Sequence, residues 1–401
     1  MINPNWMCVF VAAVACCVGA AARVASAQLT LRVSPLPSGT PPGATVFVAG
    51  DFNGWKPGDT TWALRPAGDG ALAITFPSSI RGNIAFKFTL GAWTTVETTA
   101  AGADVPNRIF TIPPTGATAV TAAVGAWKTA TAGPVPAKVS TARPSVRILS
   151  DSFVIPSLGR TRRVWVYLPP GYGVGTKRYP VMYLQDGQNV FDAATSFAGE
   201  WGVDEAIDSL AARGVAGAIV VAVDNGGVHR MDEYNPWKNA TSRLGGGEGE
   251  AYVNFLARDL KPYIDAHYRT RTDARSTTIA GSSMGGLIAL YASLTRPGVF
   301  GNAAVFSCAC WIARDEILAL VKQTKPSAPH ARFYFVVGSL EGSNSAPERD
   351  QTAVVRAMTS VGFRKDRDVV ARVAVDGRHE EWFWRREFPR AYLWLTGKFV
   401  R

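Results

Sequence analysis

A glycine-flanked serine is the strongest chemical signal in the sequence. Residues 281–285 read Gly-Ser-Ser-Met-Gly, a G-x-S-x-G pattern that lies between a β-branched run and a run with helical periodicity. Small residues allow a tight turn, and such a turn lifts the hydroxyl of Ser283 above a sheet at a helix N-terminus. The pattern alone is weak, but its strand-to-helix context predicts that Ser283 is a nucleophile.

A nucleophilic serine needs a histidine to take its proton and a carboxylate to orient that histidine. The chain has four histidines, and in the α/β-hydrolase order the base follows the serine, which leaves His330 and His379. His330 comes just before the expected strand 333–337, whereas active-site groups gather at the carboxyl ends of parallel strands. His379 follows the expected strand 369–375 and is therefore the predicted base.

The predicted acid is Glu341, because it leaves the carboxyl end of the expected strand 333–337. Asp350 lies farther along the same loop and is the alternative. Asp376 is too close to His379 in the chain to support the imidazole ring from below.

Attack on an ester carbonyl forms an oxyanion, which needs two preorganised donors. The backbone N–H of Met284 is the expected first donor, and the backbone N–H of Gln188, after a glycine that permits a tight turn, is the second. An ordinary Asp-Gly turn is the alternative interpretation of that loop. Serine chemistry requires no metal or organic cofactor, and the few histidines form no ligand cluster, so we expect neither.

These residues need a sheet to position them. From residue 145 to 401, strands alternate with helical stretches, which predicts a mostly parallel sheet with helices on both faces. The expected strands are 164–168, 181–184, 218–223, 277–280, 303–306, 333–337 and 369–375.

A different pattern fills the first part of the chain. Residues 28–127 contain short alternating runs broken by Gly, Pro and Asn, which predicts a β-sandwich. Residues 128–144 are small and punctuated by proline, as is typical of a linker.

Composition and the N-terminus limit the class of protein. With 401 residues, 47% of them hydrophobic and 18% charged, disorder and coiled coil are excluded. The net charge of +11 is spread along the chain, so we expect a solvated basic surface and no nucleic-acid partner. An apolar run followed by Ala25-Ser26-Ala27 predicts a signal peptide over 1–27 and a secreted or periplasmic protein, although Cys16 and Cys17 leave a lipoprotein or an uncleaved anchor open. No later segment is long and apolar enough to span a membrane.

After removal of the signal, two cysteines remain, Cys308 and Cys310. A bridge over a single intervening residue would be strained, so we expect two small apolar side chains near the end of a strand.

The second region resembles the putative esterase family of α/β-hydrolases, which includes feruloyl, acetylxylan and enterochelin esterases and mycolyltransferases. The resemblance lies in YLQDGQNVFD, GEWGVDEAID, AVDNGGVHRMDEYNPW, GSSMGGL, FSCACW and GRHEEWFW, in this order along the chain. It implies a triad of Ser283, Glu341 and His379 and oxyanion donors at Gln188 and Met284. It also implies substrate contacts at Asp186 and Trp311.

The first region resembles the immunoglobulin-like carbohydrate-binding module of the starch- and glycogen-binding or isoamylase N-terminal type. The resemblance lies in VFVAGDFNGWKPGD, FKFTLGAWTTVE and PNRIF. It implies that Trp55 and Trp93 offer flat faces to sugar rings. The alternative is that both side chains pack inside the sandwich or against the second domain.

Together these observations predict an exported serine carboxylesterase that hydrolyses a carbohydrate ester, of feruloyl or acetyl type, through an acyl-enzyme on Ser283. One alternative is an esterase that acts on an enterochelin-type siderophore. Another is a glycan-binding or acyl-transferring protein of the cell envelope.

Overall fold

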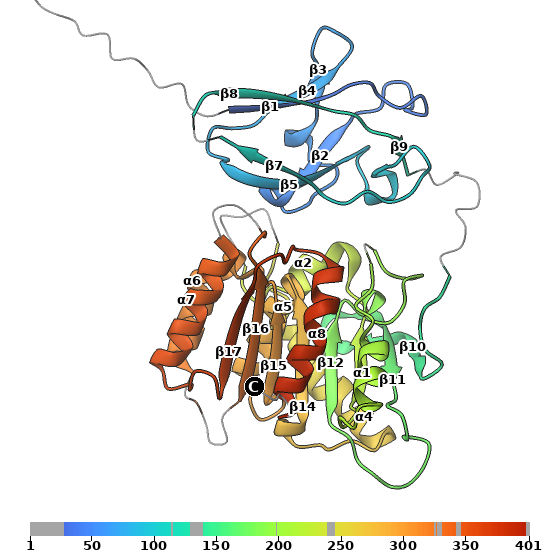
Figure 1. Ribbon diagram of the computed structural model, residues 1–401, viewed down its shortest axis with the longest axis vertical. Coiled ribbons are helices and arrows are strands. Elements are labelled where there is room, and N and C mark those ends of the chain that lie inside the picture. Colours follow the sequence, from blue (N-terminus) through green and yellow to red (C-terminus); the bar gives the residue numbers. More distant parts are fainter. Residues whose placement is uncertain are drawn as a thin grey trace, which may run out of the picture.

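A computed structural model describes residues 28–113, 115–128, 139–197, 199–238, 245–324, 326, 331–341 and 346–397. The predicted signal peptide and residues 129–138 of the predicted linker lie outside these ranges, as does His330. A β-rich module precedes a larger α/β domain, and Figure 1 shows the module above one end of that domain. Within the described ranges, no helix is both long enough and apolar enough to cross a bilayer.

The module is a sandwich of two facing sheets with a small third one. Its strands are β1 (Gln28–Val33), β2 (Phe47–Gly50), β3 (Arg65–Pro66), β4 (Leu72–Thr75), β5 (Gly82–Thr89), β6 (Glu97–Thr98), β7 (Arg108–Ile112), β8 (Ala117–Ala122) and β9 (Ala126–Trp127). One sheet has the order β3-β4-β1-β8 and the other β2-β5-β7, while β6 pairs with β9. Alternation places Leu29, Leu31 and Val33 of β1 in the core with Phe76 and Phe88. The predicted all-β sandwich is confirmed.

A buried ion pair joins three strands of the module. Glu97 in β6 is buried, and its carboxylate accepts hydrogen bonds from the Phe88 amide (2.9 Å) and from Arg108 Nη2 (2.7 Å). The Arg108 guanidinium also donates to the carbonyl of Ala123 (2.6 Å). Since a buried carboxylate without a partner is costly, this pair ties β5, β6 and β7 together.

The α/β domain is built on one sheet of eight strands. They are β10 (Val146–Ile155), β11 (Arg160–Tyr167), β12 (Val181–Gln185), β13 (Ile219–Val223), β14 (Thr277–Ser282), β15 (Asn302–Phe306), β16 (Arg332–Gly338) and β17 (Val369–Ala374). The order is β10-β11-β13-β12-β14-β15-β16-β17. The pairs β10–β11 and β11–β13 are antiparallel and the remaining pairs are parallel, which confirms the predicted mostly parallel sheet.

Helices cover both faces of this sheet, as predicted. They are α1 (Val203–Ala211), α2 (Arg230–Glu233), α3 (Gly249–Phe255), α4 (Lys261–His267), α5 (Met284–Thr295), α6 (Arg314–Gln323), α7 (Ala346–Ser360) and α8 (Glu381–Leu395). Side chains of α3 to α7 pack on one face and those of α1 and α8 on the other (Figure 1). The strand interiors are buried on both sides, which explains their nearly continuous apolar runs.

We expect Arg108→Leu to lower the free energy of unfolding of the module by about 3 kcal/mol, because Glu97 would stay buried without its cation. Denaturant titration followed by tryptophan fluorescence measures the change. Arg65→Leu, at an exposed position of β3, is the matched control and should change stability little. Equal stability of the two variants would contradict this role of the buried pair.

Candidate active site

Ser283 occupies a sharp turn between β14 and α5. Its backbone has φ 57° and ψ −121°, a conformation that non-glycine residues rarely adopt. The turn is held from both sides, because the Ser283 amide donates to the carbonyl of Phe306 (2.9 Å) and the Ser283 carbonyl accepts from the Ala309 amide (3.0 Å). The side chain therefore stands at the carboxyl end of a central strand and at the start of a helix.

Close packing explains both flanking glycines, and it is tighter at Gly281 than at Gly285. A Cβ on Gly281 would lie 2.6 Å from the backbone of Gly285. A Cβ on Gly285 would lie 3.1 Å from a carboxylate oxygen of Asp186 and from Cβ of Gln185. The G-x-S-x-G pattern thus follows from the approach of α5 to β14 and to the loop after β12.

Glu341 and His379 are brought together from the ends of β16 and β17. His379 Nδ1 lies 3.0 Å from Glu341 Oε2. The acid is only 3% exposed, whereas the His379 side chain is 45% exposed and its ring packs edge-on against Trp384. His379 and Ser283 line the same cleft. A buried carboxylate thus orients an accessible imidazole in the cleft that holds the serine.

Two residues that the sequence did not indicate support the acid. Ser307 Oγ donates to Glu341 Oε1 (2.6 Å), and the Gly338 amide donates to the same oxygen (2.7 Å). Ser307 Oγ in turn accepts from Trp384 Nε1 (2.8 Å). Since Trp384 also packs on the His379 ring, one chain of contacts fixes both the acid and the base. No local motif marks Ser307, because its role depends on contacts with distant segments.

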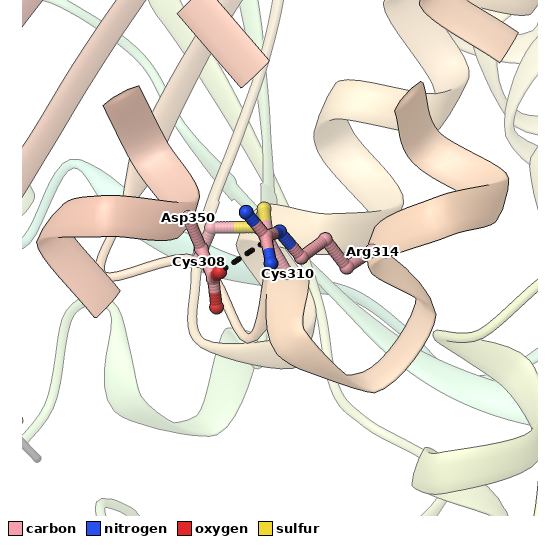
Figure 2. The surroundings of a disulfide bond; sticks show 4 residues. All are labelled: Cys308, Cys310, Arg314 and Asp350. Atoms are coloured by element: carbon pink, nitrogen blue, oxygen red, sulfur yellow. Dashed lines mark ion pairs between the residues drawn. A yellow bond between two sulfur atoms is a disulfide. The ribbon is translucent and has the colours of Figure 1, made fainter. Parts of the chain in front are cut away.

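The other candidate acids are engaged elsewhere. Asp350, on α7, pairs with Arg314 Nε (3.2 Å), as Figure 2 shows. Asp376 is mostly exposed and pairs with Arg386 (2.6 Å). Among the described residues, Glu341 forms a hydrogen bond with the His379 ring, and Asp350 and Asp376 do not.

The expectation that Cys308 and Cys310 are two free apolar side chains is wrong. They form a disulfide with a Cα–Cα separation of 5.1 Å, drawn beside Arg314 and Asp350 in Figure 2. The intervening residue Ala309 has φ −73° and ψ 43°, close to an inverse γ-turn, and such a tight turn brings residues two apart near each other. The bridge lies in the segment that contacts both Ser283 and Glu341.

Gln188, whose amide is the second expected oxyanion donor, lies in the loop after β12. Gln188 lies in a short 3-10 turn and lines the cleft with Ser283. Its side chain accepts from the Asn225 amide (3.1 Å), which fixes the loop against the end of β13. A Cβ on Gly187 would lie 2.8 Å from the Asp224 amide, so only glycine permits this approach. Met284, the first residue of α5, is buried, and its amide is among those at a helix start that have no partner within the helix.

The two expected substrate contacts, Asp186 and Trp311, lie in different surroundings. Asp186 lines the cleft, but its carboxylate is held by Arg230 (2.7 and 2.9 Å) and by Asn225 Nδ2 (2.7 Å). Its contacts are those of a residue that positions the loop. Trp311 is 48% exposed and is not among the residues that line the cleft.

The cleft lies between the two domains. Its volume is about 1060 Å³, and the module contributes Trp55, Lys87 and Trp93 to its wall. The Trp93 ring contacts Phe197 of the α/β domain in an edge-on arrangement with centroids 6.1 Å apart. The structure therefore places Trp93 in contact with the second domain and Trp55 next to Trp93 in the wall of the cleft.

Two carboxyl groups, those of Glu381 and Asp51, interact electrostatically with the histidine. Burial raises the pKa of Glu381 from its ordinary value to about 7, and burial raises the pKa of Asp51 to about 6. In both cases the charge of His379 acts in the opposite direction. Asp51 belongs to the module and Glu381 to α8, so the module reaches the surroundings of the base. Across the residues that the structure covers, no group of His, Cys, Asp or Glu side chains is arranged to hold a metal ion.

An α/β sheet with a serine turn after a central strand defines the class of α/β-hydrolases. Residues 155–395 match the Putative esterase family, and the chain belongs to it. The protein is thus a carboxylic ester hydrolase, as the sequence predicted.

Individual relatives share parts of the chain. An endo-1,4-beta-xylanase/feruloyl esterase of Xylanibacter ruminicola is 29% identical over 234 residues, which are 57% of this chain and 28% of that protein. An alpha-amylase of Niallia circulans is 41% identical over 101 residues, 25% of this chain and 8% of that protein. The chain therefore spans less than a third of each of these relatives.

A solved structure shares the fold of most of the chain. The enterobactin esterase from Shigella flexneri, determined in the presence of enterobactin, aligns with a TM-score of 0.50 at 18% sequence identity. The alignment covers 88% of this chain and 87% of that one.

We expect Ser307→Ala to lower kcat for ester hydrolysis about tenfold with little change in KM, because Glu341 would lose a donor and orient His379 less well. Steady-state kinetics on a short-chain ester measures both constants. Ser339→Ala, which removes a hydroxyl at the same strand end that bonds the Val375 carbonyl, is the control and should leave kcat unchanged. Equal kcat values for the two variants would contradict a positioning role for Ser307.

We expect Glu381→Gln to stabilise the protein above pH 7 by about 2 kcal/mol and to have little effect at pH 4.5. The pKa of Glu381 is about 7 when folded, against 4.5 ordinarily, so the folded state holds this proton more tightly. The wild type consequently loses stability as the pH rises from 4.5 to 7. The variant does not, because the glutamine side chain carries no ionisable proton. Thermal unfolding of wild type and variant at both pH values measures the difference in stability. An equal shift in Tm at the two pH values would contradict a raised pKa of Glu381.

Proposed function

We propose that this protein is a serine carboxylesterase that works through an acyl-enzyme on Ser283, with His379 as the base and Glu341 as the acid. The observation that carries the proposal is the 3.0 Å contact between His379 Nδ1 and Glu341 Oε2 in the cleft that also holds the Ser283 turn. A strained serine, an oriented imidazole and a buried acid are the three parts that acyl transfer to serine needs.

The chemistry runs in two halves. Ser283 Oγ attacks the ester carbonyl carbon while His379 takes the hydroxyl proton, and Glu341 stabilises the imidazolium through Nδ1–H. The tetrahedral intermediate collapses, the C–O bond to the alcohol breaks, and His379 gives its proton to the leaving oxygen. Water then loses a proton to His379 and attacks the acyl-enzyme, which releases the acid and returns the proton to Ser283.

The negative oxygen in both intermediates needs donors that are fixed before reaction. We assign this role to the backbone amides of Met284 and Gln188, which belong to the start of α5 and to the loop after β12. The loss of one such donor costs about 2.7–4 kcal/mol in known enzymes. The ties from the loop to Asn225 and Arg230 support this role, because they hold the donor in place.

Hydrolysis is favoured over acyl transfer by the accessibility of the base. The His379 side chain is 45% exposed in a cleft open to solvent, so water can reach the acyl-enzyme. A transferase has to keep water away from the same intermediate.

For the substrate we propose a neutral carbohydrate ester of the feruloyl or acetyl type. The similarity to a protein named endo-1,4-beta-xylanase/feruloyl esterase and to an alpha-amylase supports a carbohydrate context. We also propose that residues 1–27 direct export, that the mature protein is secreted or periplasmic, and that it meets a polysaccharide there.

We expect the wild-type protein to release p-nitrophenol from p-nitrophenyl acetate and Ser283→Ala to lose at least about 10³-fold in kcat/KM. Ser282→Ala, at the last residue of β14 directly before the Ser283 turn, is the matched control and should retain activity within about threefold. Circular dichroism establishes that all three proteins are folded. Turnover by Ser283→Ala at the rate of the control would contradict the proposed nucleophile.

A further inference from the structure

We propose that the module supplies a subsite of the catalytic cleft, in which Trp55 and Trp93 stack on a sugar ring in the alcohol part of the ester. The inference rests on the proposed function and extends it. It makes the module a determinant of specificity at the reacting site, rather than a remote anchor on a polysaccharide.

The two tryptophans face the reacting groups across one cleft. Trp55 and Trp93 are half-buried, their ring centroids are 6.3 Å apart, and their planes differ by 36°. Trp93 also contacts Phe197, an exposed side chain of the α/β domain. Ser283 and His379 line the same cleft. The three rings therefore form an aromatic surface that both domains build beside the nucleophile.

The backbone turn that presents Trp55 is fixed before any ligand binds. Trp55 has φ 59°, which is rare for a bulky residue, and its amide donates to the carbonyl of Gly50 (2.8 Å). Asn53 fixes the same turn, because its side chain accepts from the Gly50 amide (2.9 Å) and donates to the carbonyls of Val48 and Lys56. An unusual backbone conformation stabilised in this way favours a functional role for the side chain it presents. A ligand that binds there does not have to order this backbone, which lowers the entropic cost of binding.

The cleft is too large to be filled by a short ester. Its volume of about 1060 Å³ is at the upper end of sites for drug-sized ligands, which span about 300–1,000 Å³. An acyl group of acetyl or feruloyl size fills only the part near Ser283. In a polysaccharide ester the alcohol is the large component, and it must leave along the cleft past the module.

The charges of the cleft favour a neutral ligand. Its described lining includes four cationic side chains and five carboxyl groups. Three of the cations are paired within the cleft: Lys128 with Asp104, Arg230 with Asp186 and Arg385 with Glu200. Lys87, the fourth, donates to the carbonyl of Val105 (2.6 Å). A polyanion such as an iron-bound tricatecholate siderophore needs an excess of positive charge, which this lining does not offer.

Flat aromatic faces and neutral polar groups suit a sugar ring, which has an apolar face and a rim of hydroxyl groups. The cleft provides polar partners for such a rim in Asn107, Asn189 and Thr195. An aromatic acyl group could stack on the same rings, so the experiment has to separate the two parts of the ester.

Three substrates distinguish binding of the acyl group from binding of the sugar in the full-length protein: p-nitrophenyl acetate, methyl ferulate and a feruloylated arabinoxylo-oligosaccharide. We expect Trp93→Ala and Trp55→Ala each to lower kcat/KM for the oligosaccharide ester about tenfold or more, mainly through KM. The values for the two small esters should stay within about threefold of wild type. Ile109→Ala removes an exposed apolar side chain of the same module outside the cleft, and it should leave all three values unchanged.

A loss of activity on methyl ferulate equal to the loss on the oligosaccharide ester would overturn the assignment to the sugar, because the rings would then hold the acyl group. Unchanged values for all three substrates would overturn the subsite itself. A higher activity of the wild type on a tricatecholate ester than on the sugar ester would also overturn the proposal of a neutral ligand.

A binding measurement remains informative even if no ester is turned over. Calorimetry of Ser283→Ala with the unesterified arabinoxylo-oligosaccharide should show binding that Trp93→Ala, in the same background, weakens about tenfold. In the wild type, the same sugar should slow the labelling of Ser283 by a fluorophosphonate. Binding without any effect on labelling would place the sugar site outside the cleft and overturn the proposal. Inactivity on every ester with intact sugar binding would instead contradict the proposed function alone.

Discussion

The backbone conformation of Ser283 is the constraint on which the site depends. A φ of 57° at a non-glycine residue persists only where the surroundings enforce it, and here β15 and the segment after it do so through Phe306 and Ala309. The same segment continues to Ser307, which bonds Glu341. One stretch of chain, which contains the Cys308–Cys310 disulfide, thus connects Ser283 to Glu341, and distortion of it would displace both.

The β-rich module forms part of the surroundings of the site. Ser283, Glu341 and His379 belong to the α/β domain, but the cleft that Ser283 and His379 line is walled partly by Trp55 and Trp93 of the module. Burial raises the pKa of Asp51, another residue of the module, to about 6, which lies in the range where an imidazole ordinarily titrates. Both domains therefore contribute to the shape of the cleft and to the electrostatics around His379.

The sequence predicted the parts of the fold that local patterns encode. The apolar runs of the sequence indicated the parallel strands, and the glycines at 281 and 285, where packing is tight, indicated the Ser283 turn. The antiparallel edge strand β10 was missed, since its burial does not alternate regularly and its pairing contains register shifts. Ser307 and the place of Trp311 outside the cleft depend on contacts between distant segments, which no local pattern reports.

In the proposed reaction, Ser283 carries the acyl group. Intact-mass spectrometry after treatment with a fluorophosphonate, followed by peptide mapping, examines this role without a substrate, because the reagent reacts preferentially with an activated serine. We expect a single adduct on the peptide that contains Ser283 and a rate of labelling that falls when His379 is replaced by alanine. An adduct on another residue, or a protein that hydrolyses esters yet forms no adduct at Ser283, would contradict it.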